Sequence, residues 1–186
     1  MRLFVAIDIP GDVRRVLTDA VTPLRDRHDE LRWTRPATWH LTLAFLGDVS
    51  IGGRIRATTA LRLATRSARP CGVALPGRLG TFRGRFGDRV LWAAIEPEGS
   101  GLQMLVDCIR RELKAADVGF DDRPFRPHLT LARGRRGQAL PRVRTLTNPG
   151  LPCRWAVPTV ALMSSQSGQT GQYRTIATWP LHEGER

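Results

Sequence analysis

The tetrapeptide His-Leu-Thr-Leu occurs twice in this 186-residue chain, at residues 40–43 and again at residues 128–131. The offset of 88 residues between the two copies also aligns the apolar segment 3–8 with residues 91–96, without a gap. Self-similarity at a fixed offset is typical of a fold built from copies of one structural unit. The sequence therefore predicts two similar lobes, related by a pseudo-twofold axis, that each contribute one motif to a shared cleft.

The spacing of apolar residues indicates the elements of each unit. Residues 2–9 alternate as a β-strand does and end at Pro10-Gly11, after which Asp12 is expected to cap a helix that continues to Leu24. Further helices are predicted at about 53–68 and from near 100 to 113. Further strands are predicted at 31–34, 38–46, 72–75, 79–82, 89–96, 128–132, 157–163 and 173–179, loops at 77–87 and 164–171, and at most a weak helix within 134–150.

Composition excludes several classes of protein. The balance of 41% hydrophobic and 25% charged residues is that of a globular protein and argues against a disordered one. The longest apolar runs are short and broken by charges, so no membrane-spanning helix is expected. Cys71, Cys108 and Cys153 are far apart and form no CxxC pattern, which argues against a disulfide framework and a structural zinc site. Free thiols in a reducing cytoplasm are the simplest account.

The chain is strongly basic, with a net charge of +12. A basic surface attracts polyanions, of which RNA and DNA are the usual ones. Lys114 is the only lysine, so nearly all of the positive charge is arginine. Because a bias toward arginine also arises from GC-rich coding, charge alone does not establish a nucleic-acid or phosphate partner.

The repeated motif places two kinds of polar side chain on one face of a strand. Residues i and i+2 of a β-strand point to the same face, so His40 shares a face with Thr42, and His128 shares one with Thr130. The intervening leucines point the other way and can pack in a core. Two such strands at one cleft bring two imidazoles and two hydroxyls around a small volume.

That set of groups suits the cleavage of a phosphoester. One imidazole can be neutral while the other is protonated near neutral pH, so one can take a proton from a nucleophile and the other can give one to the leaving oxygen. Threonine hydroxyls can donate hydrogen bonds to the non-bridging phosphate oxygens. The sequence therefore predicts a paired acid/base site that uses neither a metal nor another cofactor.

Two alternatives apply to the histidines. A single histidine on a strand is more often structural, but two of the chain's four histidines lie in the same four-residue word, which makes that account improbable here. Zinc commonly binds histidine, yet two histidines alone make a poor site and no third residue has the spacing of a metal ligand.

Three further residues are candidates for binding substrate. Arg133 lies five residues after His128 and could reach the phosphate as a cation, and Phe45 holds the equivalent place after His40, where it could stack on a base. Strict alternation puts both on the face opposite the histidines, so each requires a bend at the strand end. Arg126, just before Pro127, is a weaker candidate for a phosphate contact.

These residues carry a family resemblance. Paired HxTx motifs in a duplicated lobe resemble the 2H phosphoesterase superfamily. The stretches Arg2–Ile9, WHLTLAFLG at 39–47, Gly77–Ile95, FRPHLTLAR at 125–133 and Tyr173–Leu181 resemble its RNA 2′,3′-cyclic phosphodiesterase branch, historically named 2′-5′ RNA ligase. The resemblance spans essentially the whole chain; segments 134–150 and 164–171 depart from it.

The resemblance implies a fold class and an activity. The fold is expected to be α+β, one bilobal domain over residues 1–186 with two antiparallel sheets lining a central cleft and helices outside. The expected reaction is metal-independent hydrolysis of a 2′,3′-cyclic phosphate to a 2′-phosphomonoester, with His40 as acid for the 3′ oxygen and His128 as base for water. Thr42, Thr130 and Arg133 are expected to hold the phosphate. The residues themselves do not order acid and base, because the pseudo-symmetry makes the histidines look alike.

The expected partners are RNA or nucleotides with 2′,3′-cyclic phosphate ends, including tRNA fragments, bound by a cytoplasmic monomer that associates with no membrane. Reversible 2′-5′ RNA ligation would use the same groups. One alternative is a phosphodiesterase for another small cyclic or 2′,5′-linked nucleotide. Another is a non-catalytic RNA-binding protein that uses its basic surface and its tryptophans, although binding alone does not require matched histidines.

Overall fold

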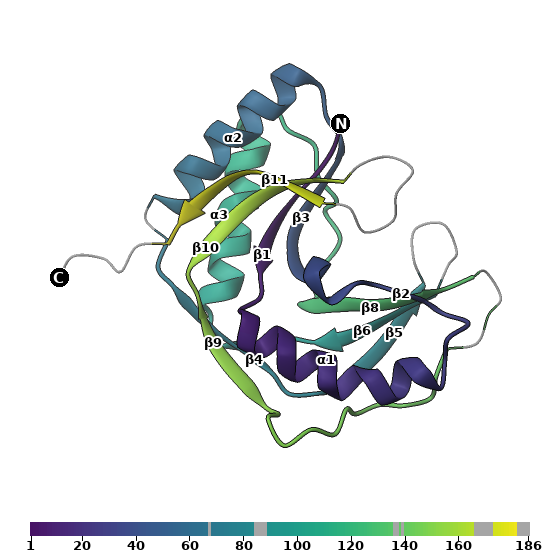
Figure 1. The fold of residues 1–186 in the computed structure, drawn as a ribbon. Coiled ribbons are helices and arrows are strands. Elements are labelled where there is room, and N and C mark those ends of the chain that lie inside the picture. The colour runs from purple at the N-terminus through teal and green to yellow at the C-terminus, as the bar shows by residue number, and fades with distance from the viewer. Residues whose placement is uncertain (67, 84–88, 136–137, 139, 166–172, 182–186) are drawn as a thin grey trace.

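The computed structural model of the chain describes all residues of 1–186 except 67, 84–88, 136–137, 139, 166–172 and 182–186. Within the described residues, the strands form two antiparallel sheets, accompanied by three α-helices (Figure 1). This agrees with the α+β fold expected from the sequence. The predicted loop at 164–171 falls almost entirely outside the described residues, apart from Ser164 and Ser165 at the end of a strand.

The larger sheet, as far as the structure describes it, has eight strands in the order β11-β10-β1-β3-β8-β6-β5, with β2 also paired to β8. These strands are β1 (Arg2–Asp8), β2 (Arg32–Trp33), β3 (His40–Asp48), β5 (Leu79–Arg83), β6 (Arg89–Ala94), β8 (His128–Gly134), β10 (Thr159–Ser165) and β11 (Tyr173–Pro180). The smaller sheet has the order β7-β4-β9, formed by β7 (Glu96–Glu98), β4 (Cys71–Leu75) and β9 (Cys153–Val157). Both motif strands therefore belong to one continuous sheet.

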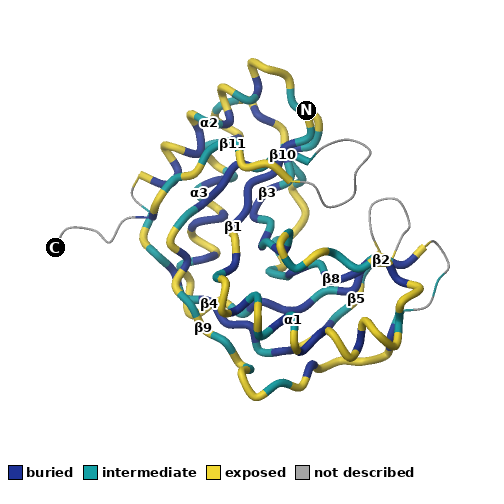
Figure 2. The backbone as a smooth tube through the Cα atoms, in the orientation of Figure 1, coloured by how far each residue is buried: buried dark blue, intermediate teal, exposed yellow. Residues whose placement is uncertain are grey.

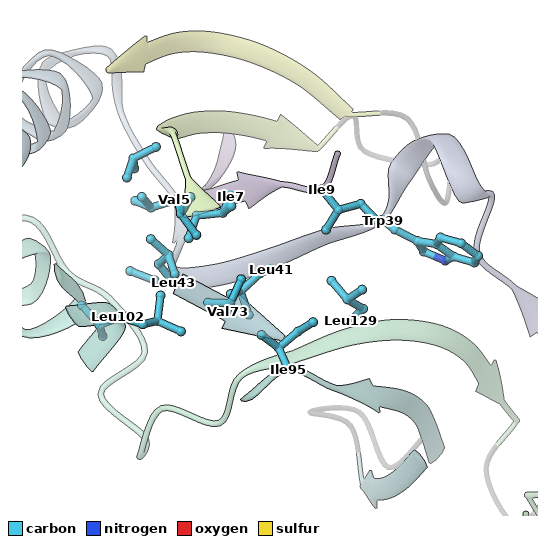
Figure 3. Packing of buried hydrophobic residues seen from close by; sticks show 14 of the residues in the cluster. Val5, Ile7, Ile9, Trp39, Leu41, Leu43, Val73, Ile95, Leu102 and Leu129 are labelled. Carbon is cyan, nitrogen blue, oxygen red and sulfur yellow. The ribbon is translucent and has the colours of Figure 1, made fainter. Parts of the chain in front are cut away.

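The two motif strands meet at the centre of this sheet. They pair antiparallel at one position, where Leu41 lies opposite Leu129. These leucines are equivalent under the offset of 88, and the strand order β1-β3-β8-β6 is the same from either side of the junction. An antiparallel pair of equivalent residues lies on a local twofold axis, so the predicted pseudo-twofold passes through this pair. Both leucines are buried and point into the core (Figure 3).

The repeat is not free of gaps, contrary to the sequence alignment. Asp8 lies opposite His40 in the pairing of β1 with β3, whereas Ala94 lies opposite His128 in the pairing of β6 with β8. The structural offset between β1 and β6 is therefore 86 residues, two fewer than between the motifs. As a consequence, the residue equivalent to Asp8 in the second lobe is Ala94.

The helices cover the sheets with their apolar faces. They are α1 (Gly11–Asp26), α2 (Ile51–Thr65) and α3 (Gly101–Ala115), and a short 3-10 turn, η1 (Pro36–Thr38), precedes β3. In Figure 1, α2 and α3 lie together beside β1, β3 and β10, while α1 lies on the side of β5, β6 and β8. None of the helices in the described part of the chain is long and apolar enough to cross a membrane.

Helix starts differ from the predicted ones. Asp12 does not cap α1: Pro10 holds the N-cap position, and Asp12 lies in the first turn, where a negative charge favours the positive end of the helix dipole. The start of α2 is two residues earlier than predicted, at Ile51, because the Ser50 side chain accepts a hydrogen bond from the backbone N–H of Gly53. Strand β9 was not predicted, and the described residues of 134–150 contain no helix.

One buried cluster joins both lobes. It includes Ile7 and Ile95 beside the central leucines, and both the strands of the larger sheet and the three helices contribute side chains to it (Figure 3). Figure 2 shows the buried residues along these elements. Apolar burial of this kind contributes about 25 cal/mol for each Å² removed from water. Because the core crosses the strand junction, each lobe buries apolar surface of the other.

Each motif strand contains a β-bulge at the same place. In the pairing with β1, Thr42 lies opposite Ala6 and Ala44 opposite Val5, so Leu43 is the extra residue. In the pairing with β6, the register shifts in the same way around Leu131. A bulge inserts one residue and reverses the alternation beyond it, and accordingly two consecutive residues, 43–44 and 131–132, are buried.

The bulges correct the expectation of strict alternation. Past the bulge, Phe45 and Arg133 return to the face that carries the histidines, so neither requires a bend at the strand end. Phe45 and Arg133 are half-buried, while the residues before them, Ala44 and Ala132, are buried. The predicted substrate-binding residues therefore share a face with the motif histidines because of a mid-strand irregularity.

A threonine stabilises the second bulge. The backbone N–H of Thr34, just after β2, donates to the Leu131 carbonyl over 2.8 Å, and the Thr34 hydroxyl lies 2.8 Å from the carbonyl oxygens of Thr130 and Leu131. The indole N–H of the buried Trp39 donates to that hydroxyl over 2.8 Å. Thr34 thereby satisfies the main-chain groups that the bulge removes from regular pairing.

We predict that Thr34→Val destabilises the protein by about 1–3 kcal/mol, because the Trp39 N–H and a bulge carbonyl are left without their partner away from water. Urea unfolding monitored by tryptophan fluorescence measures the change. Thr22→Val is the matched control, since the Thr22 hydroxyl donates to the Thr18 carbonyl on an exposed helix face. Equal stability losses in the two variants would contradict the role assigned to Thr34.

Candidate active site

The strand junction gathers the four motif side chains. Because β3 and β8 run antiparallel through the Leu41–Leu129 pair, His40 lies across the junction from Thr130, and His128 lies across it from Thr42. All four alternate away from the buried leucines and are half-buried. The charge of a protonated His128 also lowers the pKa of His40, as expected for two imidazoles at one site. The structure thus brings together the pair predicted from the sequence.

The backbone orients both imidazoles in the same way. Nδ1 of His40 lies 2.8 Å from the Thr38 carbonyl oxygen, and Nδ1 of His128 lies 2.6 Å from the Arg126 carbonyl oxygen. A carbonyl can only accept, so Nδ1 carries the proton in each ring. Nε2 is therefore the nitrogen left for chemistry, as a lone pair in a neutral ring and as a donor in a protonated one.

Aromatic rings surround each imidazole. Phe4 stacks on His40 with ring centroids 4.8 Å apart, and Tyr173 contacts it edge-on at 4.9 Å. On the other side, Phe82 lies edge-on to His128 at 5.1 Å, and the Trp92 centroid is 6.1 Å away. Tyr173 and Phe82 could not be predicted as site residues from the sequence, because strand pairing brings them from distant parts of the chain.

Gly80 is required for the position of Trp92. The two residues are paired across β5 and β6, and the indole ring lies directly over the glycine. A Cβ atom at residue 80 would lie 2.1 Å from a carbon of that ring. Only glycine allows this approach, so one side of the His128 environment depends on a residue without a side chain.

Burial and neighbouring charges set the protonation of the histidines. Desolvation is the largest influence and lowers the pKa of both, because the imidazolium is removed from water. The hydrogen bonds to the backbone carbonyls act against desolvation and raise the pKa of both histidines. The remaining charges differ: the Asp8 carboxylate raises the pKa of His40, while His128 and Arg14 lower it, and the Arg133 guanidinium lowers the pKa of His128.

Asp8 was not identified from the sequence. It lies opposite His40 in the strand pairing, and Arg14 of α1 forms an ion pair with it over 2.7 Å. Arg14 also donates to the backbone carbonyls of Ile9 and Pro36, which ties the end of β1 to η1. A lone carboxylate at a strand end gives no signal in sequence, so only the register places it beside a candidate histidine.

The remaining predicted residues take different positions. Arg133 and Phe45 lie on the histidine face, and the guanidinium of Arg2 lies over the Phe45 ring, 5.5 Å from its centroid. Arg126 supplies its carbonyl to His128, and its side chain is exposed. Within the described residues, no group of three or more His, Cys, Asp or Glu side chains is placed to hold a metal ion.

The relatives found by comparison with known proteins share one name. Three proteins named RNA 2′,3′-cyclic phosphodiesterase are similar to this chain. The Thermus thermophilus protein is 33% identical, with 95% of this chain and 87% of the relative covered, and the Escherichia coli protein is 31% identical with 97% and 96% covered. The Geobacillus stearothermophilus protein is 31% identical over 96% of this chain, which spans only 56% of that relative's length.

Solved structures agree with the fold. The crystal structure of TT0787 from Thermus thermophilus matches with a TM-score of 0.78 at 30% identity, covering 97% of this chain and 98% of that one. Escherichia coli LigT complexed with 3′-AMP matches with a TM-score of 0.70 at 29% identity, covering 97% of each chain. The family model for the 2′-5′ RNA ligase superfamily matches residues 13–169. The chain therefore belongs to the 2′-5′ RNA ligase superfamily.

Proposed function

We propose that this protein hydrolyses the 2′,3′-cyclic phosphate end of RNA to a 2′-phosphomonoester. In this reaction His128 takes a proton from water, and the water oxygen bonds to phosphorus. The bond from phosphorus to the 3′ oxygen breaks, and His40 gives a proton to the 3′ oxygen. The observation that carries the proposal is the matched pair of Nδ1–carbonyl hydrogen bonds, which leaves Nε2 of each ring for proton transfer.

The relatives support the activity. Proteins named RNA 2′,3′-cyclic phosphodiesterase are about 30% identical over nearly the whole of this chain, and a structural relative was crystallised with 3′-AMP. We extend the proposal to the whole chain 1–186 acting as one bilobal unit, without a metal or other cofactor. We also propose a cytoplasmic monomer that acts on RNA fragments, including those of tRNA.

Charge asymmetry supports the assignment of acid and base. An acid must be protonated before the reaction, and the carboxylate of Asp8 favours the protonated form of His40. A base must be neutral, and the guanidinium of Arg133 favours the neutral form of His128. The carboxylate of Asp8 thus supports His40 as the acid, and the guanidinium of Arg133 supports His128 as the base, an ordering that the sequence repeat alone does not supply.

The phosphate is proposed to lie between the threonines. Thr42 and Thr130 present hydroxyls on the histidine face, where they can donate to non-bridging oxygens, and Arg133 adds a positive charge on the same face. Phe45 is at the position equivalent to Arg133, and its ring offers a surface for a base. Arg126, whose carbonyl positions His128 and whose side chain is exposed, is proposed as a further phosphate contact.

Other functions would use the same site. Joining RNA ends through a 2′-5′ bond requires a hydroxyl in place of water, with the same acid and base. A protein that only binds RNA has no need of two imidazoles with oriented Nε2 atoms, so the paired hydrogen bonds favour an enzyme. A phosphodiesterase for another cyclic or 2′,5′-linked nucleotide would differ in which nucleotides it turns over.

We predict that wild-type protein converts a nucleoside 2′,3′-cyclic phosphate to the 2′-monophosphate in EDTA. His40→Ala and His128→Ala should each lower kcat by about 100-fold or more, since each removes one proton-transfer role. Phosphorus NMR identifies the product isomer. His28→Ala is the control, because His28 lies beside Glu30 in the segment between α1 and β2 and belongs to neither motif. Unchanged turnover in either motif variant, or strong inhibition by EDTA, would refute the mechanism.

The pH profile of kcat/KM is predicted to be bell-shaped, because one histidine must be charged and the other neutral in the free enzyme. Burial lowers the pKa of both rings, so the maximum should lie on the acidic side of the ordinary histidine value, about 6.5. Initial rates at low substrate concentration between about pH 4 and 9 test this. A flat profile over that range is incompatible with a histidine pair.

Asp8→Asn is predicted to move one limb of that profile. Removing the carboxylate lowers the pKa of His40 further, so the acid loses its proton at a lower pH and the alkaline limb shifts to lower pH. The acidic limb, set by His128, should stay in place. Asp19→Asn, on the exposed face of α1, is the charge-matched control. A shift of the acidic limb instead would reverse the assignment of acid and base.

A further inference from the structure

A cationic cavity lies at the end of the larger sheet, outside the candidate active site. It has a volume of about 500 Å³ and is bounded by the first residues of β1, the first turn of α2, and the facing ends of β10 and β11. Figure 1 shows these segments near the N-terminus. The cavity is therefore large enough for part of a nucleotide.

Positive charge dominates its lining. Arg2, Arg54 and Arg174 line it together with Met1, and no lining residue is acidic. Among the described residues, none of these arginines forms an ion pair with a carboxylate. Nε of Arg2 is buried and has no hydrogen-bond partner in the described part of the chain. A buried guanidinium nitrogen without a partner is costly, so contacts within the described chain do not explain why Arg2 is held at this position.

The chemistry of the lining fits a phosphate. Guanidinium groups bind phosphate oxygens through charge-assisted, often bidentate hydrogen bonds. Ser165 and Thr175 add hydroxyl groups to the same lining. These groups recognise phosphate and carry no means of reading a base, so the cavity favours a backbone phosphate over a specific sequence.

The cavity adjoins the candidate active site at the ends of β1 and β11. Arg174 follows Tyr173, whose ring contacts His40 at 4.9 Å, and so lies on the opposite face of β11, whereas Arg2 lies on the histidine face. On the neighbouring strands, the guanidinium of Arg2 lies over the ring of Phe45, which shares the histidine face. A strand that leaves the active site past Tyr173 and Phe45 therefore meets Arg2 first, and it reaches the other two lining arginines where it passes the end of the sheet.

We propose that this cavity binds a backbone phosphate of the RNA strand that carries the cyclic end, so that the enzyme prefers an oligonucleotide to a single nucleotide. The inference rests on the proposed function, since it concerns the substrate of the same site. Phosphate could also reach the cavity as a free anion, and the experiment separates the two sources.

The test compares two substrates in three full-length proteins. The substrates are a short RNA with a 2′,3′-cyclic phosphate end and a nucleoside 2′,3′-cyclic phosphate. The proteins are wild type, the double variant Arg54→Gln/Arg174→Gln, and Arg62→Gln, a control on the exposed face of α2. The double variant should lose at least about tenfold of kcat/KM for the RNA and retain that for the nucleotide. For the RNA, the slope of log kcat/KM against log salt concentration should also become less steep in the double variant, by about 0.7 for each phosphate that the variant no longer binds.

Each other outcome has a defined meaning. Equal RNA turnover in wild type and the double variant overturns the inference and leaves the proposed function intact. Loss of both activities, with thermal unfolding unchanged, also overturns it, because the arginines would then serve the reaction itself. A third outcome is that inorganic phosphate binds wild type but not the double variant in calorimetry, while wild type shows no preference for RNA. That outcome overturns the inference and assigns the cavity to a free anion. Wild type inactive on both substrates refutes the proposed function instead.

Discussion

The antiparallel contact of Leu41 with Leu129 is the constraint on which the site depends. Strands β3 and β8 pair with each other only at these two residues, so the two strands can diverge on either side while their centres stay fixed. A longer ladder would hold β3 and β8 flat against each other. Because the two leucines are buried in a core that both lobes share, the separation of the motif histidines is set by apolar packing rather than by a flexible hinge.

The scaffold is symmetric, but the charges placed on it are not. The motif, the bulge after it and the hydrogen bond from Nδ1 to the carbonyl two residues earlier are all duplicated. A two-residue difference in the pairing of β1 and β6 then gives His40 a carboxylate as its neighbour and His128 an alanine. At the matching position past the bulge, one lobe has phenylalanine and the other arginine. Duplication thus supplies two equivalent proton carriers, and these exceptions distinguish them.

The sequence predicted the features that depend on residue type and periodicity. Two copies of one tetrapeptide were enough to predict the pseudo-twofold and the candidate pair, because histidine and threonine alternate with buried leucines on a strand. The bulges escaped prediction, since their extra residues, Leu43 and Leu131, are ordinary strand residues with no turn signal. Asp8 and Tyr173 escaped it because register and long-range pairing, which single-sequence patterns do not encode, place them beside His40.

The same asymmetry bears on the choice between hydrolysis and ligation. Under the proposed assignment, the leaving oxygen faces the lobe of His40, and the cationic cavity holds the rest of that RNA strand on the same side. The nucleophile approaches from the side of His128. Ligation would require a second RNA strand with its 5′ hydroxyl held there, whereas water requires no binding surface. A fixed strand on one side and freely exchanging water on the other favour hydrolysis, because the abundant nucleophile meets an already positioned phosphate.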